Sequence, residues 1–221
     1  DVYKRQAIHP NNPEMQAAAE LSLPLMARAE LLGQMMKNYR LPIAISGTHG
    51  KTTTTSMISE ILLRARLDPT LSIGGILKTI GGNIRVGHSE YFVTEACEYT
   101  NSFLSFYPKI GLILNIEEDH LDFFKDLADI RSSFHRFVLL LPSDGALIIN
   151  GSIPDLSGIT ADVACPIITF GMDPSFTYSA TDITYDEKGC ASFLLLKEGA
   201  PDGHFTLSVP GEHNILNALA A

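Results

Sequence analysis

One short stretch, from Ile43 to Thr55, constrains the fold and the function of this chain more than any other. It runs from an apolar segment through a glycine-bearing turn into a lysine followed by four threonines. A buried strand, a tight loop and the start of a helix give this order, and the free N–H groups of such a helix start attract anions. The stretch therefore predicts a loop that binds the phosphates of a nucleotide.

Individual residues of this loop have the chemistry that phosphate binding needs. Gly47 and Gly50 let the backbone approach phosphate oxygens, Lys51 supplies a positive charge, and the Thr52 hydroxyl is a ligand for Mg²⁺. The strict P-loop pattern has its first glycine at the position of Ile45, so this loop is a shortened variant. A glycine turn that only caps an ordinary helix is the alternative, but Gly-Lys-Thr after an apolar strand is a specific arrangement.

Composition narrows the class of protein. The chain has 221 residues and 45% hydrophobic content, enough for one large core and at most two domains. Its net charge of -9 argues against nucleic acid or an acidic membrane surface as a partner, because either would need a broad basic face. An anionic ligand must then be bound locally, by Lys51, a helix N-terminus and Mg²⁺.

The cysteines and the hydropathy pattern favour a cytoplasmic protein. Cys97, Cys165 and Cys190 are odd in number and widely spaced, which argues against a disulfide framework or a zinc site. The sequence has no run of about 18 apolar residues and no secretory pattern at its start. A cytoplasmic location also suits a protein that uses ATP.

Three polar motifs each follow a predicted strand. They start at Gly47, Glu95 and Asn115, and the second and third follow apolar runs at 91–96 and 110–115. The segment between these two runs is long enough for a crossover helix, which favours parallel pairing. Because ligands gather at the carboxyl ends of parallel strands, we expect the three motifs to converge in space.

The pattern as a whole predicts an α/β fold, with a mostly parallel sheet, a P-loop-type nucleotide site and a small antiparallel β patch in the C-terminal part. Alternating short strands begin at Ile167 and define that patch. Capping signals and apolar periodicity predict the other elements. These are helices at 13–21, 26–38, 52–65, 130–141 and from 213, strands at 71–73 and 146–150, and a loop or hairpin at 81–87.

Glu98 and His120 are candidates to complete a metal site that begins with Thr52. Mg²⁺ prefers oxygen ligands, so Glu98 suits it, whereas the imidazole suits Mn²⁺ or a second ion better. Two alternatives stay open: Glu98 as a solvated strand end, and Asp119 with His120 as a helix cap and a supporting partner. Three further acidic residues are interpreted as exposed loop charges: Glu117, Glu118 and Asp122.

Asn214 and Asn217 lie three residues apart at the start of the predicted C-terminal helix, and therefore on one helix face. Amide side chains in this arrangement are suited to the edge of an adenine ring. Capping of the helix by Asn214 is the alternative interpretation.

Four motifs together resemble the central ATPase domain of the Mur ligases, and the resemblance extends from Ala7 to Ala221. In chain order they are Gly47 to Thr53, Glu95 to Tyr99, Asn115 to His120 and His213 to Ala218.

One branch of that family, which adds L-alanine to UDP-N-acetylmuramate, is similar to this chain at three further places. These are the loop residue His49 and, upstream, Asn12-Pro-Glu14 and Arg28-Ala-Glu30. The resemblance implies an ATP-dependent amide ligase of peptidoglycan precursor synthesis that works through an acyl phosphate. Its implied cofactors are ATP and Mg²⁺, or Mn²⁺.

The resemblance also implies residue roles. Lys51 and His120 would be catalytic, and Thr52, Glu98 and His120 would bind metal, with Thr52 and Glu98 on one ion and His120 on the second. The implied ATP-binding residues are Gly47, Thr48, His49, Gly50, Lys51, Thr52, Thr53, Asn214 and Asn217.

Domain organisation follows from the same resemblance. Residues 1–41 would be a remnant of an N-terminal UDP-binding domain with its linker, and 42–221 a truncated central ATP-binding domain. We therefore expect a fragment that is inactive alone. Two alternatives stay open: a ligase that recycles murein tripeptide, which shares the Gly-Thr-His-Gly-Lys-Thr loop, and a nucleotide-binding module without ligase activity.

Overall fold

The computed structural model describes residues 2–4, 8 and 11–221, so Ala7, where the resemblance found in the sequence starts, lies outside the described residues. The centre of the molecule is a ten-stranded sheet with the strand order β12-β11-β10-β9-β8-β7-β3-β6-β4-β5. Its strands are β3 (Leu41–Ser46), β4 (Thr70–Leu77), β5 (Gly82–Arg85), β6 (Tyr91–Glu95), β7 (Ile110–Ile113), β8 (Ala146–Asn150), β9 (Ile167–Gly171), β10 (Tyr178–Tyr185), β11 (Cys190–Lys197) and β12 (Ala200–Pro210).

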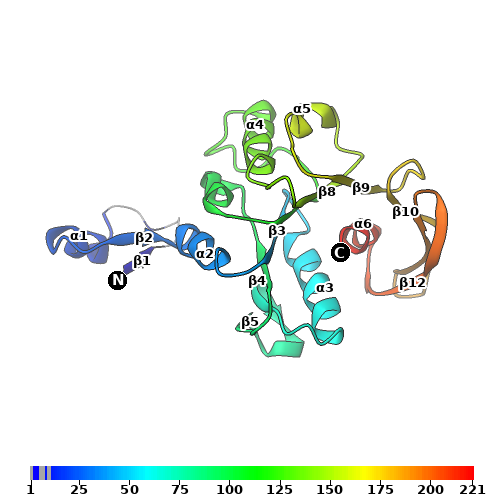
Figure 1. The fold of residues 1–221 in the computed structure, drawn as a ribbon, viewed down its shortest axis with the longest axis horizontal. Coiled ribbons are helices and arrows are strands. Elements are labelled where there is room, and N and C mark those ends of the chain that lie inside the picture. Colours follow the sequence, from blue (N-terminus) through cyan, green and yellow to red (C-terminus); the bar gives the residue numbers. More distant parts are fainter. Residues whose placement is uncertain (1, 5–7, 9–10) are drawn as a thin grey trace.

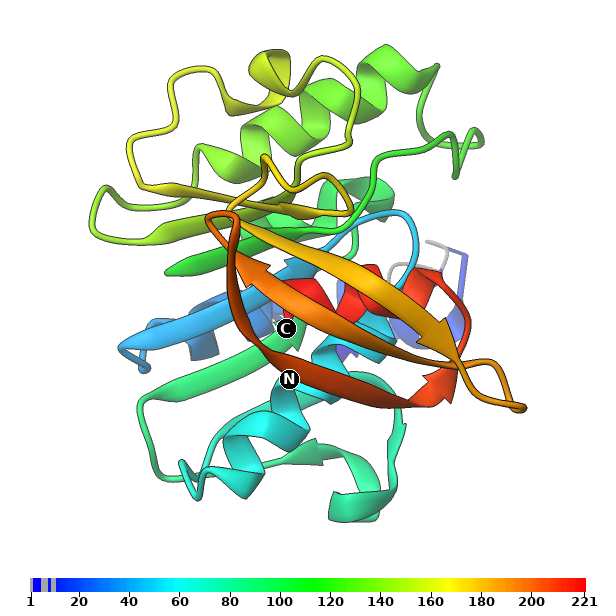
Figure 2. The same cartoon turned by 90° about the vertical axis from the view of Figure 1, so that its right-hand side faces the viewer.

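The middle of this sheet is parallel, as the sequence predicted. Every neighbouring pair from β10 through β9, β8, β7, β3 and β6 to β4 runs parallel. Antiparallel pairs lie at the two edges, β4 with β5 on one side and β10 with β11 and β12 on the other. The last three strands form the expected antiparallel patch, which curves over α6 (His213–Ala220) in Figure 2.

The expected start of the antiparallel patch at Ile167 was wrong. Strand β9 pairs parallel with β8, with Ile167 opposite Leu147 and Phe170 opposite Asn150. Phe170 is fully buried, and a short apolar run of this kind is typical of a strand covered on both faces. The antiparallel patch therefore consists of β10, β11 and β12.

The sheet separates two hydrophobic cores, and alternating residues of β3 belong to one or the other. Ile43 and Ile45 belong to the core under α3 (Lys51–Arg64) and α6, whereas Ala44 belongs to the core on the other face. That second core is covered by α2 (Arg28–Met36), α4 (Leu127–Val138) and α5 (Leu156–Thr160), and Figure 1 shows α4 and α5 together on their side of the sheet.

The crossover between β6 and β7 is not the α-helix that we expected. It is a 3₁₀ segment, η2 (Tyr99–Ser105), in which Thr100 and Asn101 have left-handed backbone angles, φ 55° and 58°. Two consecutive residues in that region cannot continue an α-helix, so the chain turns sharply just after Glu98. A second 3₁₀ turn, η1 (Lys78–Ile80), joins β4 to β5, and these strands form the hairpin expected near 81–87.

The N-terminal part projects from the body, as Figure 1 shows. Strands β1 (Val2–Lys4) and β2 (Leu25–Ala27) pair in a separate two-stranded sheet, so the helix expected from residue 26 begins only at Arg28. Helix α1 (Pro13–Glu20) begins at the predicted residue and is capped by Asn12, whose side chain accepts a hydrogen bond from the Glu14 N–H at 2.9 Å. Within the described residues, every helix is too short or too polar to cross a membrane.

Candidate functional site

The glycine loop joins β3 directly to α3 at the carboxyl edge of the sheet. Gly47 has a φ of 138° and Gly50 a φ of 86°, which side chains rarely tolerate. A Cβ added at Gly50 would lie 2.5 Å from the Asn217 Oδ1 atom. Glycine is therefore required at Gly50 for the backbone angle and for the close approach of α6. The loop leaves the first N–H groups of α3, at Lys51, Thr52 and Thr53, without helical partners, as an anion site requires.

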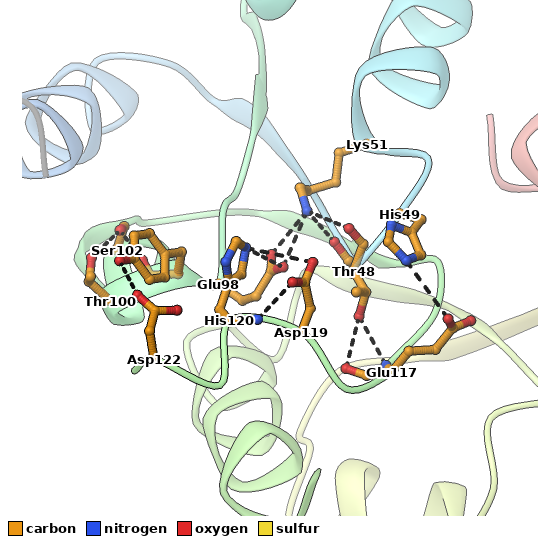
Figure 3. Close-up of polar contacts among 12 residues, drawn as sticks. Thr48, His49, Lys51, Glu98, Thr100, Ser102, Glu117, Asp119, His120 and Asp122 are labelled. Atoms are coloured by element: carbon orange, nitrogen blue, oxygen red, sulfur yellow. Dashed lines mark hydrogen bonds and ion pairs between the residues drawn. The ribbon is translucent and has the colours of Figure 1, made fainter. Parts of the chain in front are cut away.

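The loop is fastened to the segment that follows β7. The Asn115 side chain accepts a hydrogen bond from the His49 N–H at 2.7 Å and donates one to the His49 carbonyl at 3.1 Å. The Thr48 hydroxyl accepts from the Glu117 N–H at 2.9 Å, and Figure 3 shows these two residues facing each other. These bonds bring the first and third sequence motifs together, as expected from the parallel sheet.

Lys51 folds back over the loop and meets the second motif. Its ammonium donates to the carbonyl oxygens of Gly47 and Thr48 and to Glu98, with Nζ 3.1 Å from Oε2. The Glu98 side chain is 3% exposed and that of Lys51 16%, so the pair is largely withdrawn from water. A buried carboxylate needs a countercharge, and Lys51 provides it.

Glu98, Asp119 and His120 gather where the second and third motifs meet. One ligand atom from each lies within 4.8 Å of the other two, and the His120 Nε2 atom is 3.9 Å from Glu98 Oε1 and 3.8 Å from Asp119 Oδ2. Two carboxylates and one imidazole fit Mg²⁺ together with its retained waters, and fit Mn²⁺ better because of the imidazole. Asp119 is not a helix cap, since Asp126 caps α4. In the sequence, Asp119 was interpreted only as a helix cap and not as a metal ligand, although its position next to His120 was a signal.

Thr52 is paired with a different carboxylate from the one expected. Its hydroxyl donates to Glu95 Oε2 at 3.1 Å, and Glu95 Oε1 accepts from the Gly74 N–H at 2.5 Å. Among the contacts of the described residues none joins Thr52 to Glu98. Glu95 is the last residue of β6, opposite Ile45 of β3, whereas Glu98 lies beyond the strand and turns toward Lys51. Glu95 opens the second sequence motif, but the motif alone did not indicate a role for it.

A cleft of about 400 Å³ opens beside the loop. Asn217 lines it, but Asn214 is buried behind it and donates to the Pro210 carbonyl at 2.7 Å, so it is not the cap of α6. The Asn217 amide donates to Asn214 Oδ1 at 2.9 Å and accepts from the Thr54 hydroxyl at 3.2 Å. Asn214 therefore orients Asn217 toward the cleft. The remaining lining residues are His49, Gly50, Leu114, Asn115, Glu117, Asn150, Phe170, His213 and Leu216.

Two groups next to Glu98 have displaced pKa values. The Asp122 carboxylate accepts the Tyr99 hydroxyl hydrogen bond at 2.7 Å, and this bond raises the pKa of Tyr99. Burial raises the pKa of the Cys97 thiol, which keeps it protonated and unreactive near neutral pH. Glu117, Glu118 and Asp122 are exposed, as expected.

Comparison with known proteins finds relatives along nearly the whole chain. The family described as Mur ligase middle domain matches residues 45–221. A UDP-N-acetylmuramate--L-alanine ligase of Lachnospira eligens is 60% identical over 216 residues, which cover 97% of this chain and 47% of that protein. The same ligase of Agathobacter rectalis is 57% identical with the same coverage. The chain thus spans about half the length of the curated relatives it matches.

Among the similar solved structures, two Mur-type ligases that cover 99% of this chain have high TM-scores. One is a UDP-N-acetylmuramate:L-alanyl-gamma-D-glutamyl-meso-diaminopimelate ligase from Neisseria meningitides, with a TM-score of 0.87, 28% identity and 71% of that chain covered. The other is a UDP-N-acetylmuramate-alanine ligase from Thermotoga maritima, with a TM-score of 0.84, 29% identity and 49% of that chain covered.

Proposed function

The chain belongs to the Mur ligase family, and on that premise we propose that it is the ATP-binding part of a ligase that joins L-alanine to UDP-N-acetylmuramate in peptidoglycan precursor synthesis. The observation that carries the proposal is the convergence of the glycine loop, the buried Lys51–Glu98 pair and His120 at one edge of the sheet. Relatives that are 50–60% identical have this ligase activity in their names, which supports L-alanine as the amino acid.

The proposed reaction has two steps. The muramate carboxylate attacks the γ-phosphorus of ATP, so that a carboxyl O–P bond forms, the bond to ADP breaks and ADP leaves. The amine of L-alanine then attacks the acyl carbon, the C–O bond to phosphate breaks, and the amine proton passes to solvent. Lys51 neutralises charge on the transferred phosphoryl group, and the N–H groups of the α3 start hold the neighbouring phosphates.

We propose two metal positions from the donor groups. Thr52 and Glu95 would hold one Mg²⁺, with Glu95 in the place we first gave to Glu98, because the Thr52 hydroxyl is bonded to Glu95. Glu98, Asp119 and His120 would hold a second ion. Bound Mg²⁺ supplies charge neutralisation to the phosphates during transfer. Lys51 would then leave Glu98 for the β- and γ-phosphates, which frees that carboxylate for the ion.

The cleft beside the loop would take the nucleoside. Asn217, held in place by Asn214, faces the space that an adenine edge would occupy, and His213 and Phe170 supply flat side chains. We propose that 42–221 is the central ATP-binding domain and that 1–41 belongs to an N-terminal UDP-binding domain and its linker. We also propose a cytoplasmic location, which suits an enzyme that uses ATP.

One experiment separates this proposal from its two alternatives. The full-length protein is incubated with ATP, Mg²⁺, UDP-N-acetylmuramate and either L-alanine or murein tripeptide, and products are identified by mass spectrometry. An alanyl product supports the proposal, whereas a tripeptide product alone supports the recycling ligase, whose solved relative from Neisseria meningitides also superposes well. Nucleotide binding without either product leaves a binding module.

A further inference from the structure

His120 lies in a segment without regular structure, between β7 and α4, and its own φ is 52°. Neither a helix nor a strand therefore fixes the direction of its imidazole. Its backbone is held, because the His120 carbonyl accepts from the Phe123 and Phe124 N–H groups at 2.9 and 3.0 Å, and Phe124 is buried in the core. The side chain needs a separate constraint.

Tyr99 supplies that constraint. The centroids of its ring and of the His120 imidazole are 4.5 Å apart, with 34° between the planes. Its hydroxyl donates to Asp122 Oδ2 at 2.7 Å, and its ring also meets Phe123 edge-on at 6.1 Å. One side chain thus contacts three residues of the segment that carries His120.

The base of this side chain is fixed as well. The Tyr99 carbonyl accepts from the Ser102 hydroxyl at 2.5 Å, and the Asn101 N–H donates to the Glu98 carbonyl at 2.9 Å in the left-handed turn. Tyr99 also follows Glu98 directly in the chain. The same backbone turn therefore positions Glu98 and, through Tyr99, the imidazole that faces it.

We propose that Tyr99 is a positioning residue that holds the His120 imidazole toward Glu98, with Asp122 as the anchor of its hydroxyl. The proposal rests on the proposed function insofar as His120 serves a metal ion beside the nucleotide. Glu98 and His120 are 3.9 Å apart, a spacing at which both can reach one ion only if neither side chain rotates away. We call the contacts of Tyr99 with His120 and Asp122 the clamp. Its removal should therefore weaken cation binding while leaving nucleotide contacts intact.

The test compares three variants of the full-length protein with a matched control. Tyr99→Leu removes the ring, while Tyr99→Phe and Asp122→Ala each remove only the hydroxyl bond. Tyr107→Leu is the control. Tyr107 is half-exposed under Lys37 and lies near the amino end of β7, whereas Tyr99 and His120 lie beyond the carboxyl ends of the strands. Mn²⁺ binding in the presence of ADP is measured from the paramagnetic resonance signal of free Mn²⁺, and ADP affinity is measured without metal.

The expected results are specific to the clamp. Tyr99→Leu should weaken Mn²⁺ binding about tenfold and the two hydroxyl variants about threefold each, with unchanged ADP affinity and an unaffected control. The Tyr99→Phe/Asp122→Ala double variant should be no worse than either single one, since both lose the same bond. In metal-free wild-type protein, the Tyr99 ring should shift the NMR signals of the His120 ring protons upfield. In metal-free Tyr99→Leu, this upfield shift should be absent.

A second cycle shows whether Tyr99 acts through His120. In a His120→Ala background, Tyr99→Phe and Tyr99→Leu should have no further effect on Mn²⁺ binding. Wild-type Mn²⁺ affinity in Tyr99→Leu overturns the proposal. So does a loss of Mn²⁺ affinity on Tyr99→Leu that is equally large in the wild-type and His120→Ala backgrounds. If Tyr99→Leu does not fold, the Mn²⁺ affinities of Tyr99→Phe and Asp122→Ala decide. Wild-type protein that makes no alanyl product but shows this Tyr99 dependence would sink the proposed function alone. Product formation with Mn²⁺ binding independent of Tyr99 would sink this inference alone.

Discussion

The Lys51 ammonium and the Glu98 carboxylate lie 3.1 Å apart in a site where both are largely shielded from water. Lys51 also donates to two carbonyl oxygens of its own loop, so all of its hydrogen-bonding capacity is used within the protein. The ammonium thus occupies the mouth of the loop in which phosphates would bind. In the proposed function, binding of a nucleotide would require this lysine to exchange protein oxygens for phosphate oxygens.

Lys51→Ala in the full-length protein should abolish phosphate release, with a loss on the order of 10²–10³ or more, because the charge stabilises the transferred phosphoryl group. The measurement is phosphate release at saturating ATP, alongside thermal unfolding to show that the fold is kept. Lys109→Ala is the matched control, since Lys109 pairs with Asp144 at the other edge of the sheet. Unchanged turnover in Lys51→Ala would refute the nucleotide site.

Local patterns were sufficient to predict the loop, its strand and its helix, because adjacent residues create them. The partner of Thr52 was not predictable in the same way. Glu95 and Glu98 are both acidic and three residues apart, and the choice between them depends on β6 ending at Glu95 and on the left-handed turn at Thr100 and Asn101. The parallel pairing of β9 was hidden for a similar reason, since a short apolar run does not reveal its neighbour.

Glu98→Ala and His120→Ala should each raise the Mg²⁺ concentration needed for half-maximal activity by roughly tenfold or more. Both remove a group from the cluster with Asp119, and the effect should be larger for Mn²⁺ in His120→Ala because imidazole prefers that ion. Metal titrations of turnover check this. Glu90→Ala, which removes an ion pair between a half-buried Glu90 and an exposed Arg40 away from the cluster, should behave as wild type. An unchanged metal requirement in either variant would remove that residue from the metal site.

Gly74→Ala should mimic the loss of Glu95 without touching it. A Cβ at Gly74 would lie 2.6 Å from Glu95 Oε2. The carboxylate must therefore move away from the Thr52 hydroxyl, from which it now accepts a hydrogen bond. We expect the Mg²⁺ requirement to rise about tenfold, as for other losses of a metal-orienting bond. Gly82→Ala in the same hairpin meets no atom within 4 Å and is the control. Equal Mg²⁺ requirements in both variants would argue against the role of Glu95.

Asp68 should make stability depend on pH at a point far from the loop. Hydrogen bonds from the Arg85 side chain and then from the His88 backbone lower the pKa of Asp68 from 3.8 to about 2. Since the folded pKa lies below the unfolded one, this stabilisation is complete above about pH 4 and is lost as the pH falls toward 2. The melting temperature of Asp68→Asn should therefore lie below that of wild type at pH 7, and the gap should close at low pH. Asp202→Asn, on exposed β12, is the control and should melt at the wild-type temperature. A difference in melting temperature between Asp68→Asn and wild type that does not change with pH would contradict this role of Asp68.

The 221-residue chain alone should form no alanyl product. The residues proposed to bind the nucleotide and the metal ions all lie within this chain, and the Thr54–Asn217 hydrogen bond fastens α6 to α3 beside the cleft. Ligation also needs the acceptor amine held in line with the acyl phosphate and shielded from water, which is a matter of positioning by surrounding protein. The curated relatives are about twice as long, which leaves room for that protein. The check is incubation of the purified chain with UDP-N-acetylmuramate, L-alanine, ATP and Mg²⁺, followed by mass spectrometry. Product at a rate near that of the full-length protein would show that residues 1–221 contain the whole ligation site.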